Sequence, residues 1–412
     1  MLTIILLIYL SVAVVSYYLE FLNIRQVKRY GHIVPREFAG SVDDGVLKKT
    51  RDYTLEQSRL SLVHSIFNDL VVILFFFGGL ISIYNAWIVS LDLPFIISGT
   101  LFFLFLVYTK TLLSLPFDLY STFGIENKYG FNTMTGKLWV SDLLKAIILT
   151  TILVSSASLS VFFLIRLRPD SWWFLVWLFS LLFSLFILYI SPYVIEPLFN
   201  KITPLKDMAL EGSIKDLMKK AGIVVSRVFQ IDASKRSRHS NAYFTGIGKV
   251  KRIVLYDTLL QKLDKDEVLS VLAHEAGHWK KRHILKRIVL IEAFSFIGLY
   301  IAFKIIRTGY LSSLFHIQSD TLFVKLLILG FIWGIVSFPL TPLMSYLSRR
   351  HEKEADVFAA ELTGNPEAMA RSLIKLSTDN LSNLHPHPLY ASFYYSHPPV
   401  VKRVREIRGE AG

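Results

Sequence analysis

Cysteine is absent from the 412 residues, so the chain forms no disulfide bond and offers no thiolate to a metal. Any transition metal must therefore be held by histidine and carboxylate side chains. Internal repeats and low-complexity linkers are also missing from the sequence. What is abundant is apolar: 53% of the residues are hydrophobic, 31 are Phe, and the mean hydropathy is +0.46. This composition excludes an ordinary soluble protein and predicts a membrane protein.

Seven apolar stretches are long enough to cross a bilayer as helices, which takes roughly 20 residues each. The first lacks both the basic region and the small-residue cleavage site of a signal peptide, so we expect it to be a membrane anchor. The predicted spans cover residues 2–18, 70–89, 95–115, 143–165, 172–190, 288–303 and 322–343.

The formal net charge of +13 is explained without a nucleic-acid partner, because cytoplasmic loops of multi-pass proteins are rich in Lys and Arg. The loop after the first span is basic, which predicts that it is cytoplasmic and that the N-terminus lies outside. Seven crossings then place two polar segments on the same cytoplasmic side. The predicted organisation is spans one to five in 1–195, a cytoplasmic protease segment in 196–287, spans six and seven in 288–344, and a cytoplasmic tail in 345–412.

The segment between spans five and six has the pattern of a small α+β domain. A helix is predicted near 208–221, and β-branched residues predict strands at 224–231, 241–246 and 253–256. A further helix is expected from Asp264, because acidic residues in its first turn suit the helix dipole. We expect this last helix to continue into the sixth span.

That helix carries the pentapeptide H-E-x-x-H at residues 274–278. In an α-helix, residues i and i+4 lie on one face, so His274 and His278 are able to bind one ion. Glu275 then lies beside the water that such an ion holds, where it serves as a general base. Packing alone has no need for this spacing, and the motif therefore predicts a zinc hydrolase.

A catalytic zinc site usually takes a third protein ligand. The extended pattern with a third histidine requires Gly at 281 and His at 284, but the sequence has Lys281 and Ile284, so that class is excluded. The tail offers carboxylates instead, and the residues alone leave Glu352 and Glu354 both open. With Glu352 as ligand, Asp356 lies one turn away and is expected to accept a hydrogen bond from a ligand imidazole.

Other polar residues receive weaker predictions. Glu292 lies inside the sixth span, where ionisable residues usually face an interior or pair with a cation. Four further histidines lack the spacing of metal ligands and are expected at the surface or at interfaces: His283, His351, His385 and His387.

Several segments together resemble the integral-membrane zinc CAAX prenyl proteases, which mature prenylated proteins. They run from the third span to the tail: PFDLY at 116–120, 126–132, PLFNK at 197–201, SKRSRHSNAYFTG at 234–246, KRIVLYDTLL at 251–260, 349–356 and YSHPP at 395–399.

The resemblance implies a mainly α fold, with seven transmembrane helices around an intramembrane chamber and a cytoplasmic α+β, zincin-like protease domain. It favours Glu352 as the third ligand of one Zn²⁺ per chain, followed by Asp356. It also implies that Asn241, Ala242 and Tyr243 form an edge strand to which the substrate peptide adds. His397, and with it Asn241, is expected to stabilise the oxyanion during hydrolysis.

The expected function is hydrolysis of prenylated C-terminal peptides in the bacterial inner membrane or the eukaryotic endoplasmic reticulum membrane. One alternative is a quality-control metalloprotease resembling HtpX, although chains of that type are usually shorter and have fewer spans. A transporter with a structural metal is a third reading, but a structural zinc normally has four protein ligands and the sequence offers no convincing fourth. The oligomeric state is left open.

Overall fold

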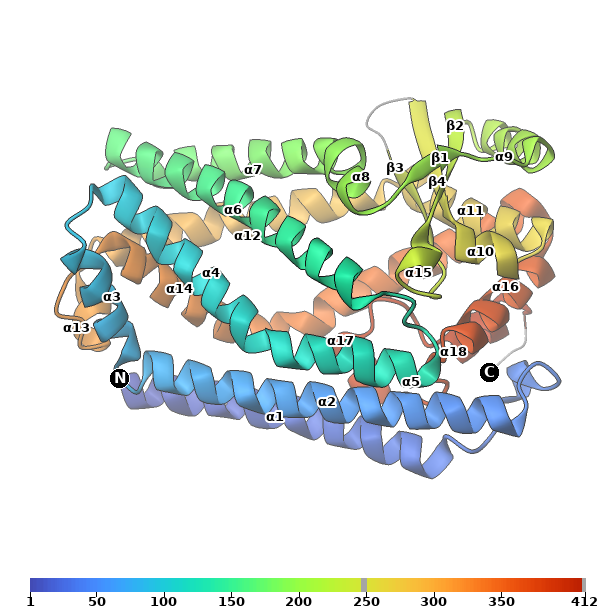
Figure 1. Ribbon diagram of the computed structural model, residues 1–412, viewed down its shortest axis with the longest axis horizontal. Helices are drawn as coiled ribbons and strands as arrows, with labels where there is room; N and C mark the ends of the chain where they lie inside the picture. The colour runs from blue at the N-terminus through green and yellow to red at the C-terminus, as the bar shows by residue number, and fades with distance from the viewer. Residues whose placement is uncertain (246–249, 410–412) are drawn as a thin grey trace.

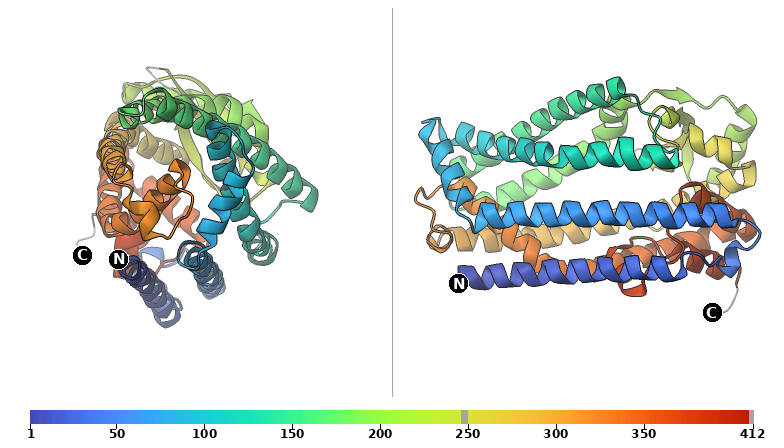
Figure 2. Two further views of the ribbon diagram at one scale, coloured as in Figure 1. Left: turned by 90° about the vertical axis from the view of Figure 1, so that its left-hand side faces the viewer. Right: turned by 60° about the horizontal axis from the view of Figure 1, so that its bottom comes forward.

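The seven membrane-spanning helices dominate the molecule. The computed structural model describes residues 1–245 and 250–409, and seven of its helices are long and apolar enough to cross a membrane. They run roughly along the long axis (Figure 1), and the end-on view shows them arranged as an open ring (Figure 2). The spans are α1 (Leu2–Tyr30), α2 (Asp44–Phe76), α4 (Phe95–Leu119), α6 (Gly136–Leu167), α7 (Trp172–Ile190), α12 (His283–Ile306) and α14 (Leu322–Ser337).

The position predicted for the second span is wrong. Residues 70–89 do not form one helix, because the chain turns at Gly79, whose φ of +84° suits a residue without a side chain. The helix α3 (Leu80–Ser90) after the turn has 11 residues, too few to cross a bilayer. The true span, α2, begins much earlier and carries its charged residues toward one end. The other six predicted spans are confirmed as helices.

Three spans continue through a π-helical or 3₁₀ turn into a further α-helix. The span α4 passes through the π-helix η2 (Tyr120–Glu126) into α5 (Asn127–Tyr129), and α7 passes through η3 (Ser191–Ile195) into α8 (Glu196–Phe199). The last span, α14, continues through the 3₁₀ turn η5 (Phe338–Leu340) into α15 (Thr341–Thr363). The tail helix that carries Glu352 is therefore a direct extension of the seventh span.

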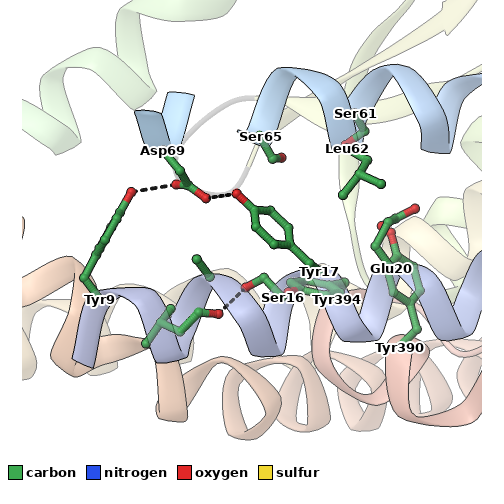
Figure 3. A pocket seen from close by; sticks show the side chains of 12 residues that line it. Tyr9, Ser16, Tyr17, Glu20, Ser61, Leu62, Ser65, Asp69, Tyr390 and Tyr394 are labelled. Carbon is green, nitrogen blue, oxygen red and sulfur yellow. Dashed lines mark hydrogen bonds between the residues drawn. The ribbon is translucent and has the colours of Figure 1, made fainter. Parts of the chain in front are cut away.

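A half-buried carboxylate joins the first two spans. Tyr9 and Tyr17 of α1 both donate hydrogen bonds to Asp69 of α2, the first at 2.6 Å (Figure 3). Beside them lies a cavity of about 410 Å³ lined by polar and apolar side chains of α1, α2 and the tail helix α17 (Pro388–Tyr394). The hydroxyl groups satisfy a charge that would be costly in lipid.

Glu292 of α12 is turned toward protein. Its Oε2 atom is buried and has no hydrogen-bond partner among the described residues, and its backbone carbonyl accepts a hydrogen bond from Trp177 of α7 at 3.1 Å. The predicted cation partner is thus not found in the described part of the chain, whereas the predicted orientation away from lipid agrees with this burial.

A four-stranded sheet lies at the end of the molecule opposite the N-terminus (Figure 1). The strands are β1 (Ile202–Pro204), β2 (Val224–Ile231), β3 (Ala242–Thr245) and β4 (Val250–Tyr256), in the order β1-β2-β4-β3. Strands β2 and β4 are parallel, and the other pairs are antiparallel. The three predicted strands are confirmed, although Gly246 at the end of the second lies outside the described residues. Strand β1 was not predicted.

Helices α9 (Met208–Lys220), α11 (Lys265–Lys280) and α15 pack together beside the sheet and form with it the polar domain of the molecule. Helix α9 matches its prediction, and α11 carries the pentapeptide. The expected fusion of α11 with the sixth span is wrong, because the chain turns at Arg282, with φ of +56°, before α12 begins. Helix α11 packs on α15, α9 and β3 through buried residues that include Leu272 and Ala276. The remaining short elements are η1 (Arg36–Phe38), η4 (Ala233–Lys235), α10 (Asp257–Lys262), α13 (Tyr310–Leu314), α16 (Pro366–Asp379) and α18 (Val400–Ile407).

Candidate active site

Helix α11 brings the two histidines of the pentapeptide together. Its first turn is closed by a capping box in which Asp264 and Glu267 each accept a hydrogen bond from the other's backbone N–H. One turn apart on the buried face, His274 and His278 place their Nε2 atoms 3.2 Å from each other. The spacing of the motif therefore converges two imidazole nitrogens on one point.

Helix α15 supplies the carboxylate that completes this group. Glu352 places Oε2 3.4 Å from Nε2 of His274 and Oε1 3.2 Å from Nε2 of His278. The two helices approach closely at Gly277, where an added Cβ would lie only 3.0 Å from Cα of Ala355. The absence of a side chain at this crossing lets the carboxylate reach the histidines.

The arrangement fits a metal ion. One ligand atom each from His274, His278 and Glu352 lies within 4.8 Å of the others. Oε2 of Glu352 is buried and accepts no hydrogen bond of good geometry among the described residues, as expected of an oxygen aimed at an ion. Two imidazoles and one carboxylate form the three-ligand set of hydrolytic metal sites.

The outer nitrogen of His274 is held by a charged pair. Nδ1 of His274 lies 2.7 Å from Oδ1 of Asp356, and Arg403 of α18 binds Asp356 in a bidentate manner at 2.6 and 2.8 Å. Burial lowers the pKa of His274, but its hydrogen bonds to Asp356 and Glu352 outweigh burial and raise the pKa to about 9. An ion at Nε2 must take the place of a proton there.

The outer nitrogen of His278 is held by another histidine. Nδ1 of His278 lies 3.0 Å from Nδ1 of His283, whose Nε2 lies 3.1 Å from Oε2 of Glu354. The ring of His351 stacks on His283 with centroids 4.1 Å apart and an interplanar angle of 9°. His283 is 4% exposed and contacts residues of α11 and α15, so of the two predicted places, surface or interface, the structure shows the interface. Glu354 binds His283 and Arg350 rather than the ligand cluster.

Glu275 is half-buried next to these histidines. Burial raises the pKa of Glu275, while the nearby His274 and His278 oppose the rise. A carboxylate in this setting has a pKa nearer to neutrality, which suits a group that accepts and returns protons.

His397 reaches the site from the tail. Its Nδ1 lies 2.6 Å from Oε2 of Glu352, and 61% of its side chain is exposed. The loop before it is fixed by Arg349 of α15, whose Nη1 donates hydrogen bonds to three backbone carbonyl oxygens, those of Ala391, Ser392 and Tyr395. His397 therefore stands beside the cluster with its ring open to solvent.

The predicted substrate strand is the edge strand of the sheet. In the described part of the chain β3 pairs only with β4, and it packs against α11. Asn241 is exposed, and its side-chain oxygen accepts a hydrogen bond from the N–H of Ala242. Tyr243 donates to Glu196 at the end of the fifth span. The contacts described for Asn241 thus lie within its own sheet and not with the histidines.

Two other predicted interface histidines lie away from the cluster. Nε2 of His385 is 2.7 Å from the carbonyl oxygen of Ile33, and the side chain of His387 caps α17. Arg403 and the role of His283 were not predicted, because both contacts depend on the packing of separate helices. The one available signal in the sequence was that the tail carries two carboxylates close to Glu352, namely Glu354 and Asp356, which need partners of opposite charge or hydrogen-bond donors.

The sequence is similar to known membrane proteases along almost its whole length. Residues 23–201 match the family described as CAAX prenyl protease N-terminal, five membrane helices, and residues 204–411 match peptidase family M48. A CAAX prenyl protease 1 homolog of Arabidopsis thaliana is 34% identical over 414 residues, covering 96% of each chain. CAAX prenyl protease 1 of Saccharomyces cerevisiae is 33% identical and covers 94% of this chain and 91% of its own.

A bacterial protein and a solved structure extend these matches. An uncharacterised metalloprotease of Bacillus subtilis is 33% identical and covers 79% of this chain and 77% of its own. The crystal structure of S. mikatae Ste24p superimposes with a TM-score of 0.90, at 30% identity, covering 98% of both chains. The chain therefore belongs to the CAAX prenyl protease branch of peptidase family M48 and is a multi-pass membrane metalloendopeptidase.

Proposed function

We propose that this protein is a zinc-dependent endopeptidase that cleaves peptide bonds of membrane-associated substrates, foremost prenylated CAAX-type C-termini, with one zinc per chain. The observation that carries the proposal is the convergence of His274, His278 and Glu352 beside the half-buried Glu275. Three protein ligands leave a fourth position for water, as in catalytic rather than structural zinc sites.

Zinc bound there supplies Lewis acidity, which lowers the pKa of water toward about 7 and polarises a peptide carbonyl. The chain's own residues handle the protons. Glu275 accepts a proton from the attacking water and passes it to the amine of the leaving peptide. Its burial favours this double role because the raised pKa makes the return of the proton easier. Asp356 and Arg403 hold the imidazole of His274 in place during the reaction.

The substrate peptide binds by adding a strand to β3. The edge of β3 next to α11 offers backbone groups beside the ligand cluster, and main-chain hydrogen bonds give affinity without demanding a particular sequence. Asn241, Ala242 and Tyr243 provide this edge. His397 donates a hydrogen bond to the oxyanion, since its ring borders Glu352 and is open to solvent. Asn241 assists if its exposed side chain turns from Ala242 toward the substrate.

A prenylated peptide matches both halves of the molecule. We expect its apolar tail to lie among the spans, which form an open ring in the end-on view, and its backbone to lie at the polar domain (Figure 2). The support is the end-to-end similarity to CAAX prenyl proteases of plants and yeast. A quality-control protease of unprenylated membrane proteins is the second candidate, because the similarity also extends to a bacterial protein that is named only as a metalloprotease.

One assay separates the two candidates. Purified protein is incubated with a farnesylated CAAX peptide and with the same peptide lacking the farnesyl group, and Glu275→Gln serves as the inactive control. Cleavage that needs zinc, Glu275 and the farnesyl group supports the proposal. Equal cleavage of both peptides favours the quality-control function, and undiminished turnover by Glu275→Gln contradicts the mechanism.

We further propose that the catalytic domain is cytoplasmic, in the bacterial inner membrane or the endoplasmic reticulum membrane. The basic loop after α1 and the sheet lie at the same end of the molecule, opposite the N-terminus (Figure 1). Because the chain lacks cysteine, Ser41→Cys and Ser171→Cys are single labelling sites at opposite ends. In a bacterial host whose inner membrane stays intact, an impermeant thiol reagent added outside should label only the second. The reverse pattern would contradict this topology.

A further inference from the structure

The two ligand histidines are supported in different ways. His274 meets a carboxylate directly, with Asp356 at 2.7 Å. His278 instead meets the ring of His283 at 3.0 Å, and a carboxylate, Glu354, follows only at the next step. The second arrangement is a relay of two imidazoles and one carboxylate, which begins on α11, passes to the first residue of α12 and ends on α15.

The geometry of the relay fixes its protons. His278 uses Nε2 toward the ion, so its single proton lies on Nδ1 and is donated to the nearest acceptor. That acceptor is the lone pair of Nδ1 of His283, 3.0 Å away. His283 must then carry its own proton on Nε2, from which it donates to Oε2 of Glu354 at 3.1 Å. Every nitrogen of the two rings thus has one defined role.

The surroundings of His283 hold its ring in this orientation. The left-handed turn at Arg282 directs the start of α12 back toward α11, and the side chain of His283 is 4% exposed. The ring of His351 stacks on it almost in parallel. Glu354 is fixed in turn by Arg350, at 3.2 Å. A residue that only filled space would need neither nitrogen, but both nitrogens of His283 are paired.

We propose that His283 is a positioning residue for the metal centre, which sets the proton position and ring orientation of His278, and that Glu354 sets those of His283. The proposal rests on the metal site proposed above. It predicts that the relay contributes to metal affinity rather than only to the packing of the three helices. Loss of such an outer partner of a metal ligand typically weakens metal binding by about 10–100-fold.

The test measures zinc affinity of the full-length protein in detergent, by competition with a chelator of known affinity, together with the melting temperature of the zinc-free protein. His283→Phe keeps a ring that stacks on His351 but removes the acceptor, and about 10–100-fold weaker zinc binding is expected. His283→Asn restores an acceptor close to the place of Nδ1 and should recover most of the affinity. His351→Phe preserves the stack, removes no hydrogen bond found among the described residues, and serves as the matched control with affinity near wild type.

A role in packing alone predicts a different pattern. In that case zinc affinity would follow the melting temperature of the zinc-free variants, and His283→Asn, with no ring to stack, would bind zinc more weakly than His283→Phe. Either that pattern, or wild-type affinity in His283→Phe, overturns the proposal. Failure of the proposed function has another signature, because the wild type itself would then bind no zinc or retain turnover after Glu275→Gln.

Discussion

The membrane spans and the catalytic helices are both α-helical, but they differ in how much of their surface is buried against other parts of the protein. Helix α7 has 19 residues, of which only Trp172 and Val176 are buried, and the rest of its apolar surface is suited to lipid. Helix α11 has 16 residues, and half of them are buried, including His274 and Glu267. In the spans, apolar side chains are compatible with lipid and need no specific partner. In the catalytic domain, each buried polar group needs a partner from another helix.

The two halves also differ in how their polar side chains are connected. The polar contacts described above for the membrane half join two helices at a time, as in the pairing of Tyr9 and Tyr17 of α1 with Asp69 of α2. Those around the ligand cluster link α11, α12, α15 and α18 into one network. We therefore expect substitutions in the catalytic half to have large effects on chemistry and stability, and matched substitutions in the spans to have small ones.

The largest contrast is expected from removing one carboxylate in each half. Glu275→Gln removes the general base, so turnover should fall by about 10²–10⁴-fold while zinc stays bound. The same change in the sixth span, Glu292→Gln, should leave turnover near wild type, because the Oε2 atom of Glu292 is buried and has no hydrogen-bond partner among the described residues, the ligand cluster included. Peptide cleavage and zinc content of both purified variants test this. Equal losses of turnover would erase the contrast.

The next effect concerns the charge pair behind His274. Arg403→Ala leaves Asp356 buried without its bidentate partner and should destabilise the protein by about 3 kcal/mol. Lys402→Ala on the same helix is the control, since Lys402 is 65% exposed and lies 4.0 Å from Glu406. Denaturant unfolding in detergent gives both values. If Arg403→Ala unfolds as the control does, the buried pair contributes little.

Substitution of one glycine in each half, Gly277 and Gly298, measures how tightly the helices pack there. Gly277→Ala places a Cβ 3.0 Å from Cα of Ala355, and such overpacking costs about 1–3 kcal/mol and should weaken zinc binding. Gly298→Ala in α12 meets only Trp333, at 3.9 Å, so the better helix propensity of alanine should leave stability equal or slightly higher. Melting temperatures of the two variants decide the comparison. A stabilised Gly277→Ala would mean that α11 and α15 are not tightly packed.

The smallest effect is expected in the first span. Tyr9→Phe removes one of the two hydroxyl groups that bind Asp69 and should cost about 1 kcal/mol. Tyr18→Phe is the control, because Tyr18 is 58% exposed. Cleavage activity should not change in either variant. A loss of activity in Tyr9→Phe would show that the first span is coupled to the site.

The sequence predicted what depends on local pattern. Hydropathy located six spans, and the spacing of His274 and His278 placed both nitrogens at one point. Hydropathy misplaced the second span, because the average hydropathy of residues 70–89 is not affected by the turn at Gly79. Glu352 and Glu354 remained equal candidates by residue type, and only the packing of α15 on α11 separates them.

The partners of the ligands lay beyond the reach of local pattern. His283 follows His278 by five residues, and in a continuous helix two residues at that spacing do not lie on the same face. The turn at Arg282 brings the two rings together. Arg403 reaches Asp356 from the last helix, 47 residues away in the chain. Both contacts follow from tertiary structure alone.

The zinc content of two matched variants tests the central claim most directly. The claim is that α11 and α15 together hold one zinc through His274, His278 and Glu352. Purified without chelators, the wild type should contain one zinc per chain, Glu352→Gln should contain almost none, and Glu354→Gln should retain zinc at saturating concentration. Zinc retained in Glu352→Gln, or a wild type without zinc, would contradict the account.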